Sequence, residues 1–299
     1  MSISATMVRE LREKTNAGMM DCKKALMETG GDFEKAIDWL RAKGLSAAAK
    51  KSGRIAAEGA VTAQSNGKVG VLAEINSETD FVARNDDFKA FVKEVAAHVT
   101  NNPAGDILTQ KWAGGSTVEE KVKQMVATIG ENIVVRRTLK YELTGEGYIH
   151  TYVHGEGKIG VMVEVGGKDT PDLRAFAADV CLHIAAMNPM AISADQMPAD
   201  VVAKEKEVLR AKNLEAGKKA DMIDKIVEGQ IRKFLAESCL LDQAFVKNPD
   251  LKVGDYMKET AKKTGGEVSL KRFARFELGE GIEKKVEDFA AEVAAQMKN

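Results

Sequence analysis

The stretch Asn66-Gly-Lys-Val-Gly-Val-Leu-Ala-Glu-Ile75 is echoed ninety positions later by Glu156-Gly-Lys-Ile-Gly-Val-Met-Val-Glu-Val165. Gly, Lys, Gly, Val and Glu match in register, which is hard to attribute to chance. In both copies the Gly-Lys pair follows an extended segment, residues 60–65 in the first and 148–154 in the second. A turn-forming pair between two extended runs is typical of a β-hairpin, and Asn66-Gly67 suits a type I′ turn. The sequence therefore predicts two related β-hairpins.

Each hairpin is followed by apolar residues at the spacing of a helix. The first helix carries Phe91 and His98, and the second has the matching pair Phe176 and His183. A hairpin that leads into a helix is the unit of an α+β fold, in which helices cover a face of an antiparallel sheet. We therefore expect an α+β fold with a duplicated core of antiparallel hairpins and helices.

The second copy is five residues shorter between the end of its hairpin and the start of its helix. The missing counterpart is the Thr-Asp-Phe-Val segment within Ser77-Glu-Thr-Asp-Phe-Val-Ala-Arg-Asn85. This segment sets an aromatic, Phe81, beside a carboxylate, Asp80, on a predicted loop between a strand and a helix, and such loops commonly carry function. Because one half makes the connection without these residues, the fold does not require them. We expect Phe81 to contact another molecule.

A small helical module precedes the repeat. Apolar residues at helical spacing predict three short helices within residues 4–44, the last ending near Gly44, and Asp32 is placed to cap the third. A basic, Ala-rich link is expected over residues 45–54.

Two further helical regions interrupt and follow the repeat. Between the halves, Thr117-Val-Glu-Glu120 resembles a capping box at the start of a connecting helix, and an extended run follows over residues 133–143. Residues 200–235 are rich in charge but keep a helical apolar stripe, and Ala216-Gly217 can form the bend of an antiparallel helical hairpin. That hairpin either packs on its own core or projects as an arm that meets another chain. The stripe and its expected partner face comprise Ile223, Ile226, Val227, Ile231 and Phe234, and Val201, Val202, Val208 and Leu209.

A terminal helix is predicted from apolar residues between Ile282 and Met297, after a strand over residues 273–278. The chain then divides into five parts. These are an N-terminal helical module (1–54), a first core half (55–140), a second core half (141–186 and 236–277), a helical hairpin (187–235) and a C-terminal helical module (278–299).

Composition narrows the class of partner. Of the 299 residues, 44% are hydrophobic and 30% are charged, and the formal net charge is −1. The chain has no overall excess of positive charge that would indicate binding to nucleic acid or to an anionic membrane. We therefore expect the partner to be a protein or a small molecule. Cys22, Cys181 and Cys239 are odd in number and widely separated, which argues against a disulfide framework and against a zinc site. With no recognisable signal peptide and no membrane-spanning run, we expect a cytoplasmic protein.

Several patterns that usually carry chemistry are weak here. Residues 155–160 match G-x-G-x-x-G, but the strand-like run after them is wrong for a dinucleotide site, where a helix must follow. His150 and His154 lie on a predicted strand, where four residues span about 13 Å, so they cannot share one metal ion. The chain has no G-x-x-x-x-G-K-[ST] motif. We predict neither a metal site nor a cofactor.

Met19 and Met20, at the start of a predicted helix, either cover the core of the module or face a partner. The alternative to a binding protein is an enzyme whose site is assembled from scattered carboxylates and His98 or His183. Those two histidines lie on apolar helix faces, which is more typical of core residues.

Taken together, four features resemble the bacterial elongation factor Ts family. They are Asn16-Ala-Gly-Met-Met-Asp-Cys-Lys-Lys-Ala-Leu26, the segment 77–85, the duplicated hairpins and Phe276-Glu-Leu-Gly-Glu-Gly-Ile-Glu283. The resemblance implies a guanine-nucleotide exchange factor for elongation factor Tu, not an enzyme. It also implies a ubiquitin-associated-type (UBA-like) N-terminal module, a two-part core, a coiled-coil helical hairpin and a C-terminal helical module. A homodimer through the helical hairpin is the other interaction considered.

The same resemblance implies roles for individual residues. Asp80, Phe81, Val82 and Ala83 correspond to the family segment that disturbs the Mg²⁺ site of the partner GTPase. His154 matches a family histidine near the phosphate-binding side of the partner, although Gly155-Glu-Gly-Lys departs from the more common sequence of that turn. Met19 and Met20 match the N-terminal contact.

Overall fold

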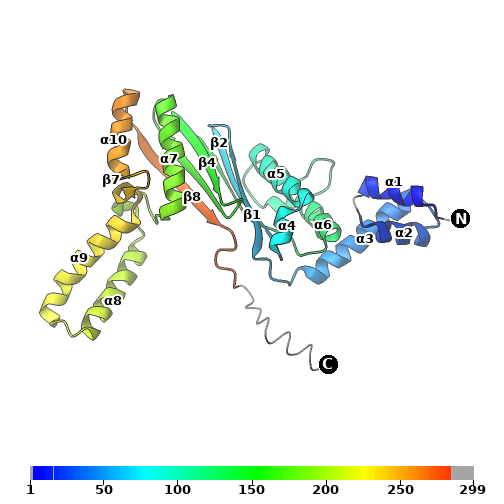
Figure 1. Ribbon diagram of the computed structural model, residues 1–299, viewed down its shortest axis with the longest axis horizontal. Helices are drawn as coiled ribbons and strands as arrows, with labels where there is room; N and C mark the ends of the chain where they lie inside the picture. The colour runs from blue at the N-terminus through cyan, green and yellow to red at the C-terminus, as the bar shows by residue number, and fades with distance from the viewer. Residues whose placement is uncertain (1–2, 16, 284–299) are drawn as a thin grey trace.

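The structure is a computed structural model that describes residues 3–15 and 17–283. It is elongated (Figure 1): a group of helices lies at one end, two β-sheets lie in the middle with helices on their outer faces, and a helical arm projects at the other end. The fold is therefore mixed α and β with antiparallel sheets, as predicted. No helix within the described residues is long and apolar enough to cross a bilayer.

The N-terminal module consists of three helices around a small core that includes Leu11, Cys22 and Leu26, all fully buried. Asp32 caps the third helix as predicted, because its Oδ1 accepts a hydrogen bond from the Lys35 amide at 3.1 Å. The helices are α1 (Ala5–Thr15), α2 (Met19–Glu28) and α3 (Phe33–Lys51).

The third helix is longer than the sequence predicts. Gly44 does not end α3, and residues 45–51, expected to form a link, continue the helix. Gly44 is buried where α3 crosses α6 (Val118–Ile129), and an added Cβ would lie 3.0 Å from Cβ of Ala127. This glycine permits the close approach of two helices rather than a helix end.

Two three-stranded antiparallel sheets form the core, and each belongs to one copy of the repeat. Both hairpins are confirmed, and each pairs with a third strand from later in the chain. The extended run after α6, expected to be connective, is the third strand of the first sheet. Both sheets carry a bulge at the matched position, between Glu74 and Ile75 and between Glu164 and Val165. The first sheet contains β1 (Glu58–Ser65), β2 (Val69–Ser77) and β3 (Val134–Glu142), and the second contains β4 (Gly147–His154), β5 (Ile159–Gly166) and β8 (Ser269–Glu277).

The first hairpin does not use a type I′ turn. That turn needs positive φ at both central residues, and Asn66 is not among the non-glycine residues with positive φ. Instead the Asn66 side chain accepts hydrogen bonds from the amides of Lys68 and Val69, at 3.0 and 2.8 Å. The asparagine therefore closes the turn with its side chain.

The two sheets pack face to face, and helices cover their outer faces. Leu72 and Tyr141 of the first sheet meet Ile149 and Met162 of the second in a buried cluster. The outer face of the first sheet is covered by α4 (Asp80–Arg84), α5 (Asp86–Asn101) and α6, and that of the second by α7 (Pro171–Met187) and α10 (Val253–Thr264). The short strands β6 (Ala244–Phe245) and β7 (Asn248–Lys252) precede α10. The capping box at Thr117 and Glu120, which opens α6, is confirmed.

The helical hairpin consists of α8 (Ala199–Glu215) and α9 (Ala220–Ser238) and projects from the body as an arm (Figure 1). Gly217, with φ of 69°, lies in its bend as predicted. Its core is thin and centres on Ile223, Val227 and Ile231. Val208, expected on the inner face, is 40% exposed. The predicted terminal helix lies outside the described residues beyond 283.

Each sheet buries one glutamate of the repeat, Glu74 or Glu164, both with 0% exposure. Burial would raise the pKa of the Glu74 carboxyl, but the Gly279 amide and two guanidinium groups outweigh it and hold the pKa below its ordinary value. Burial would likewise raise the pKa of the Glu164 carboxyl, but hydrogen bonds from Arg272 and Thr144 outweigh it and hold the pKa below its ordinary value. Both carboxylates are therefore paired and charged in the folded protein.

Acid is expected to destabilise the fold through these two groups. A carboxyl whose pKa is lowered by folding stabilises fully above its unfolded pKa of about 4.3, and it loses that contribution as the pH falls through the folded pKa. Below about pH 4.3 the free energy of unfolding should therefore fall more steeply in the wild type than in Glu164→Gln. Urea denaturation at a series of pH values measures this. Glu142→Gln, at an exposed carboxylate of β3, should keep the wild-type dependence, and superimposable curves for wild type and Glu164→Gln would contradict the prediction.

Candidate functional site

The last three residues of the inserted Thr-Asp-Phe-Val segment begin a short helix, α4, in place of the predicted loop. It lies between β2 and α5, and Thr79 and Asn85 flank it in extended conformation. In the second half, β5 leads to α7 across residues 167–170, and the structure describes no helix there. The sequence argument for an insertion that the fold can omit is therefore confirmed, although the insertion is ordered as a helical turn.

Of the first four residues of α4, two face solvent and two anchor the helix. Phe81 is 77% exposed, and Asp80 is exposed with its Oδ2 3.5 Å from the Arg84 guanidinium. Val82 is buried in the core beneath α5, and Ala83 packs against the same cluster. Phe81 therefore projects outward from a helix that its two neighbours hold in place.

Hydrogen bonds from a distant part of the chain fix the start of α4. The Glu131 carboxylate accepts from the Thr79 amide at 3.0 Å and from the Thr79 hydroxyl at 2.7 Å. Glu78 accepts from the Asn132 amide at 2.6 Å. At the other end, Asn85 caps α5. Sequence reasoning missed Glu131 and Asn132, because they lie some fifty positions away and carry no motif.

The turn after His154 is brought to the same end of the sheets as α4. His154 is exposed at the end of β4, and its Nδ1 lies 2.9 Å from the Tyr152 hydroxyl. Glu58 pairs in register with Ser77, just before α4, and its carboxylate lies 3.1 Å from the Lys158 ammonium, just after the turn. Residues far apart in sequence thus share one end of the two sheets.

Met19 and Met20 lie elsewhere, on the N-terminal module. They are 56% and 74% exposed, so the interpretation that they cover the core of the module is wrong. The module is held against α6 by an ion pair between Arg41 and Glu120 at 2.5 Å and by a hydrogen bond from Lys51 to the Gly130 carbonyl at 2.5 Å. A cavity of about 320 Å³ lies between the module and α6. The methionines form a second exposed apolar surface.

The two matched histidines, of which His183 is buried and His98 half-buried, make hydrogen bonds within their own halves. His183 is fully buried; its Nε2 lies 2.9 Å from the Gln243 side-chain oxygen, and its Nδ1 accepts from the Val246 amide at 3.2 Å. Burial lowers the pKa of His183, partly opposed by the hydrogen bond to Gln243. His98 makes the equivalent contact with Gln110 at 2.9 Å and stacks on Trp112. Both rings are satisfied by their own half.

The remaining histidine pair and the glycine-rich run both lie at strands. His150 and His154 do lie on one strand, β4, and the G-x-G-x-x-G run leads into strand β5, not into a helix. Within residues 3–15 and 17–283 no group of three or more His, Cys, Asp or Glu side chains could hold a metal ion. What the candidate site offers is a rigidly mounted, exposed aromatic side chain, which is typical of an anchor in a protein interface.

Comparisons with known proteins show which family the chain resembles along its length. A family model described as "Elongation factor TS" matches residues 78–280. The chain is 65% identical to "Elongation factor Ts" of Bdellovibrio bacteriovorus, with 100% of this chain and 99% of the relative covered. It is 49% identical to the protein of that name from Trichlorobacter lovleyi, with 99% and 98% covered, and 49% identical to that of Syntrophotalea carbinolica, with 100% of both covered.

Proposed function

Because the chain belongs to the elongation factor Ts family, whose role is in translation elongation, we propose that it is the guanine-nucleotide exchange factor of elongation factor Tu. It binds the GDP form of that GTPase and speeds the exchange of GDP for GTP. It acts in the cytoplasm and needs no cofactor of its own. Its N-terminal module is proposed to be UBA-like.

The observation that supports the proposal is that Phe81 is exposed on a helix whose position is fixed. GTPases hold their nucleotide through backbone amides around the phosphates and through Mg²⁺, so a group that disturbs this region loosens the product. Phe81 is 77% exposed on a helix fixed by Val82 and by Glu131. Because the helix is already fixed, its backbone does not have to be ordered when the partner binds, which lowers the cost of binding. We infer that Asp80 and Phe81 enter the partner, while Val82 and Ala83 hold them in position.

Phe81 alone cannot account for nucleotide exchange. Acceleration of GDP release by about 10⁴ to 10⁵ requires roughly 5.5 to 7 kcal/mol, since each tenfold corresponds to about 1.4 kcal/mol. Burial of one phenylalanine contributes only about 1.5 to 3 kcal/mol. We therefore propose that His154 and the exposed pair Met19 and Met20 bind at the same time, so that the partner is held over a broad interface. Neither nucleic acid nor a membrane is part of the proposal.

The role proposed for the arm is contact with a second copy of this chain. Leu214 and Met222, near its bend, are 55% and 54% exposed. A homodimer through α8 and α9 is consistent with these side chains and stays a prediction.

Stopped-flow measurement of GDP release tests the proposal directly. Elongation factor Tu loaded with fluorescent GDP should release it faster by at least about a hundredfold when this protein is added. The nucleotide-free complex should form stably and dissociate when GDP is added, because the coupling between the two ligands is reciprocal. Release at the intrinsic rate, or a complex indifferent to GDP, would refute the exchange function. Turnover of a small molecule without any partner protein would instead favour the enzyme alternative.

A further inference from the structure

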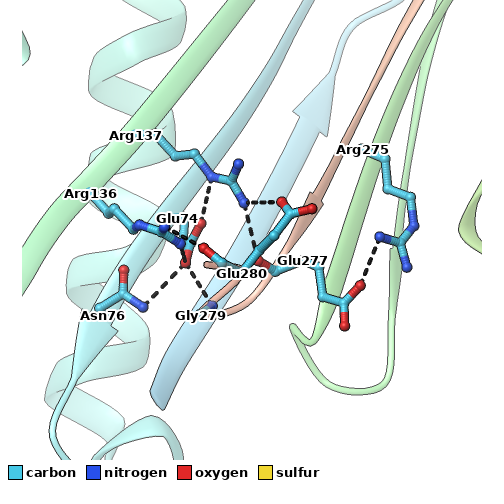
Figure 2. A network of polar contacts seen from close by, with 8 residues as sticks. All are labelled: Glu74, Asn76, Arg136, Arg137, Arg275, Glu277, Gly279 and Glu280. Carbon is cyan, nitrogen blue, oxygen red and sulfur yellow. Dashed lines mark hydrogen bonds and ion pairs between the residues drawn. The ribbon is translucent and has the colours of Figure 1, made fainter. Parts of the chain in front are cut away.

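The Glu74 carboxylate is the centre of a polar network near the end of β2 from which the chain enters α4 (Figure 2). It accepts hydrogen bonds from Arg136 at 2.9 Å and from Arg137 at 2.6 Å. It also accepts from the backbone amide of Gly279 at 2.8 Å and from the Asn76 side chain at 3.2 Å. Four donors surround the fully buried carboxylate, so its charge is compensated by hydrogen bonds, whereas the side-chain oxygen of Asn76 has no hydrogen-bond partner among the described residues.

The same two arginines hold the turn that follows β8. Arg137 donates to the Glu277 carbonyl at 3.1 Å and to the Glu280 carboxylate at 3.0 Å, and Arg136 donates to the Glu280 carbonyl. Gly279 has φ of 71°, and an added Cβ would lie 2.5 Å from the Ala57 carbonyl oxygen. The turn therefore fits closely against the segment that enters β1.

The residues that hold the start of α4 lie just before β3, the strand that carries these arginines. Glu131 and Asn132, just before β3, bind Thr79 and Glu78, at the start of α4. Glu74 itself lies on β2, which ends three residues before Asp80. Glu74 fastens the turn after β8 to β2 and β3, and Glu131 and Asn132 fasten the start of α4 beside the same two strands.

The second half provides a matched carboxylate without the inserted helix. Glu164 is equally buried and accepts from Arg272 at 2.7 Å and from the amide and hydroxyl of Thr144 at 3.2 and 3.0 Å. Thr144 follows β3 as Gly279 follows β8, so each carboxylate holds the strand exit of the other sheet. Glu164 lies near the end of β5 that is remote from the turn after His154. This type of clamp therefore forms whether or not a partner-binding helix is attached.

We propose that Glu74 is a positioning residue for nucleotide exchange, which holds α4 and the turn 277–282 in one fixed arrangement so that the partner meets both at once. The inference rests on the exchange function proposed above and goes beyond it, because Glu74 is fully buried and acts only through the elements that it holds. Loss of the fixed arrangement lowers the fraction of molecules that is ready to bind, and apparent affinity falls by that fraction. Once bound, the partner restores the arrangement, and the saturating rate is retained.

A comparison of Glu74→Gln with Glu164→Gln tests this positioning role. Each change keeps the shape of the side chain but removes its charge and sets an amide donor against a guanidinium group, so both should lower the midpoint of thermal unfolding by similar amounts. Glu74→Gln should raise the concentration for half-maximal GDP release about tenfold, with the saturating rate within about twofold of wild type. Glu164→Gln should leave both parameters unchanged. Equal effects of the two variants on exchange would reduce Glu74 to a structural role.

A second variant and a partner-free measurement cover other outcomes. Gly279→Ala strains the turn and leaves Glu74 in place, so it should also raise the half-maximal concentration; wild-type values would overturn the proposal. Amide hydrogen exchange of the free protein should rise at residues 78–84 and 277–282 in Glu74→Gln, and only around Thr144 in Glu164→Gln. If the amides of α4 keep their protection in Glu74→Gln, the positioning role is refuted. If the wild type does not speed GDP release but the variants show the predicted amide hydrogen exchange, only the proposed function is refuted.

Discussion

Phe81→Ala is expected to slow GDP release from elongation factor Tu by about ten- to a hundredfold at a fixed, subsaturating concentration of this protein. The side chain is 77% exposed when the protein is alone, so its apolar surface is available for burial in the partner. Burying a phenylalanine contributes about 1.5 to 3 kcal/mol, and each 1.4 kcal/mol corresponds to about tenfold. Stopped-flow release of fluorescent GDP measures the effect.

The fold of this variant should be unaffected, because Phe81 makes no core contact and Val82 and Ala83 still anchor α4. Met190→Ala is a matched control: Met190 is 54% exposed but lies between α7 and the helical arm. Its exchange rate should equal that of the wild type. Unchanged release by Phe81→Ala, with the thermal midpoint also unchanged, would remove Phe81 from the mechanism.

Gly70→Val should cost about 3 kcal/mol of folding free energy, and Gly160→Val a similar amount. Gly70 lies on β2 where the sheets meet, and an added Cβ would overlap Ile149 and lie 2.7 Å from Sδ of Met162. Gly160 takes the matched place on β5, where a Cβ would lie 2.5 Å from Cγ1 of Val61. Overpacking at such an interface forces the sheets apart, because neighbouring side chains have no space to move into.

Urea denaturation measures these two losses, and Gly266→Ala is the control. A Cβ added at Gly266 would meet no atom within 4 Å, and the residue lies in a loop before β8, so its substitution should change stability by less than about 0.5 kcal/mol. A loss below that size for both valine variants would mean that the sheets are not packed as closely as described. A loss for only one would mean that the two halves are not equivalent at this contact.

Much of the core could be predicted from the sequence because its signals are local. The matched glycines and glutamates of the two hairpins mark the close approach of the sheets and the buried carboxylates at the bulges. The duplication extends further, because Arg137, Tyr141 and Glu142 of β3 recur as Arg272, Phe276 and Glu277 of β8. This similarity is weaker and contains no turn motif, so local patterns alone predict connective structure for β3. Each arginine of the pair stacks on the aromatic ring of the other sheet, Arg137 on Phe276 and Arg272 on Tyr141.

The candidate site could be predicted only in part, for the same reason. Phe81 stands out because a shorter second copy reveals the insertion, and no such internal comparison exists for Glu131 or for Gly44. Local patterns predict a helix end at Gly44 because glycine ends many helices, whereas its lack of a side chain lets α3 lie against Ala127. A single sequence does not distinguish these two uses of glycine.

By itself, the sequence determined the repeating hairpin and helix unit, the inserted segment that presents Phe81, and the helical arm, because periodicity and turn chemistry act between near neighbours. Only the tertiary structure decided that α4 is a helix held by Glu131, that the turn after His154 lies at the same end, and that Glu74 clamps the exit of β8. These contacts join residues from 52 to 205 positions apart. Packing of the two sheets brings these partners together, and burial leaves the Glu74 carboxylate only those donors that the packed strands bring within reach.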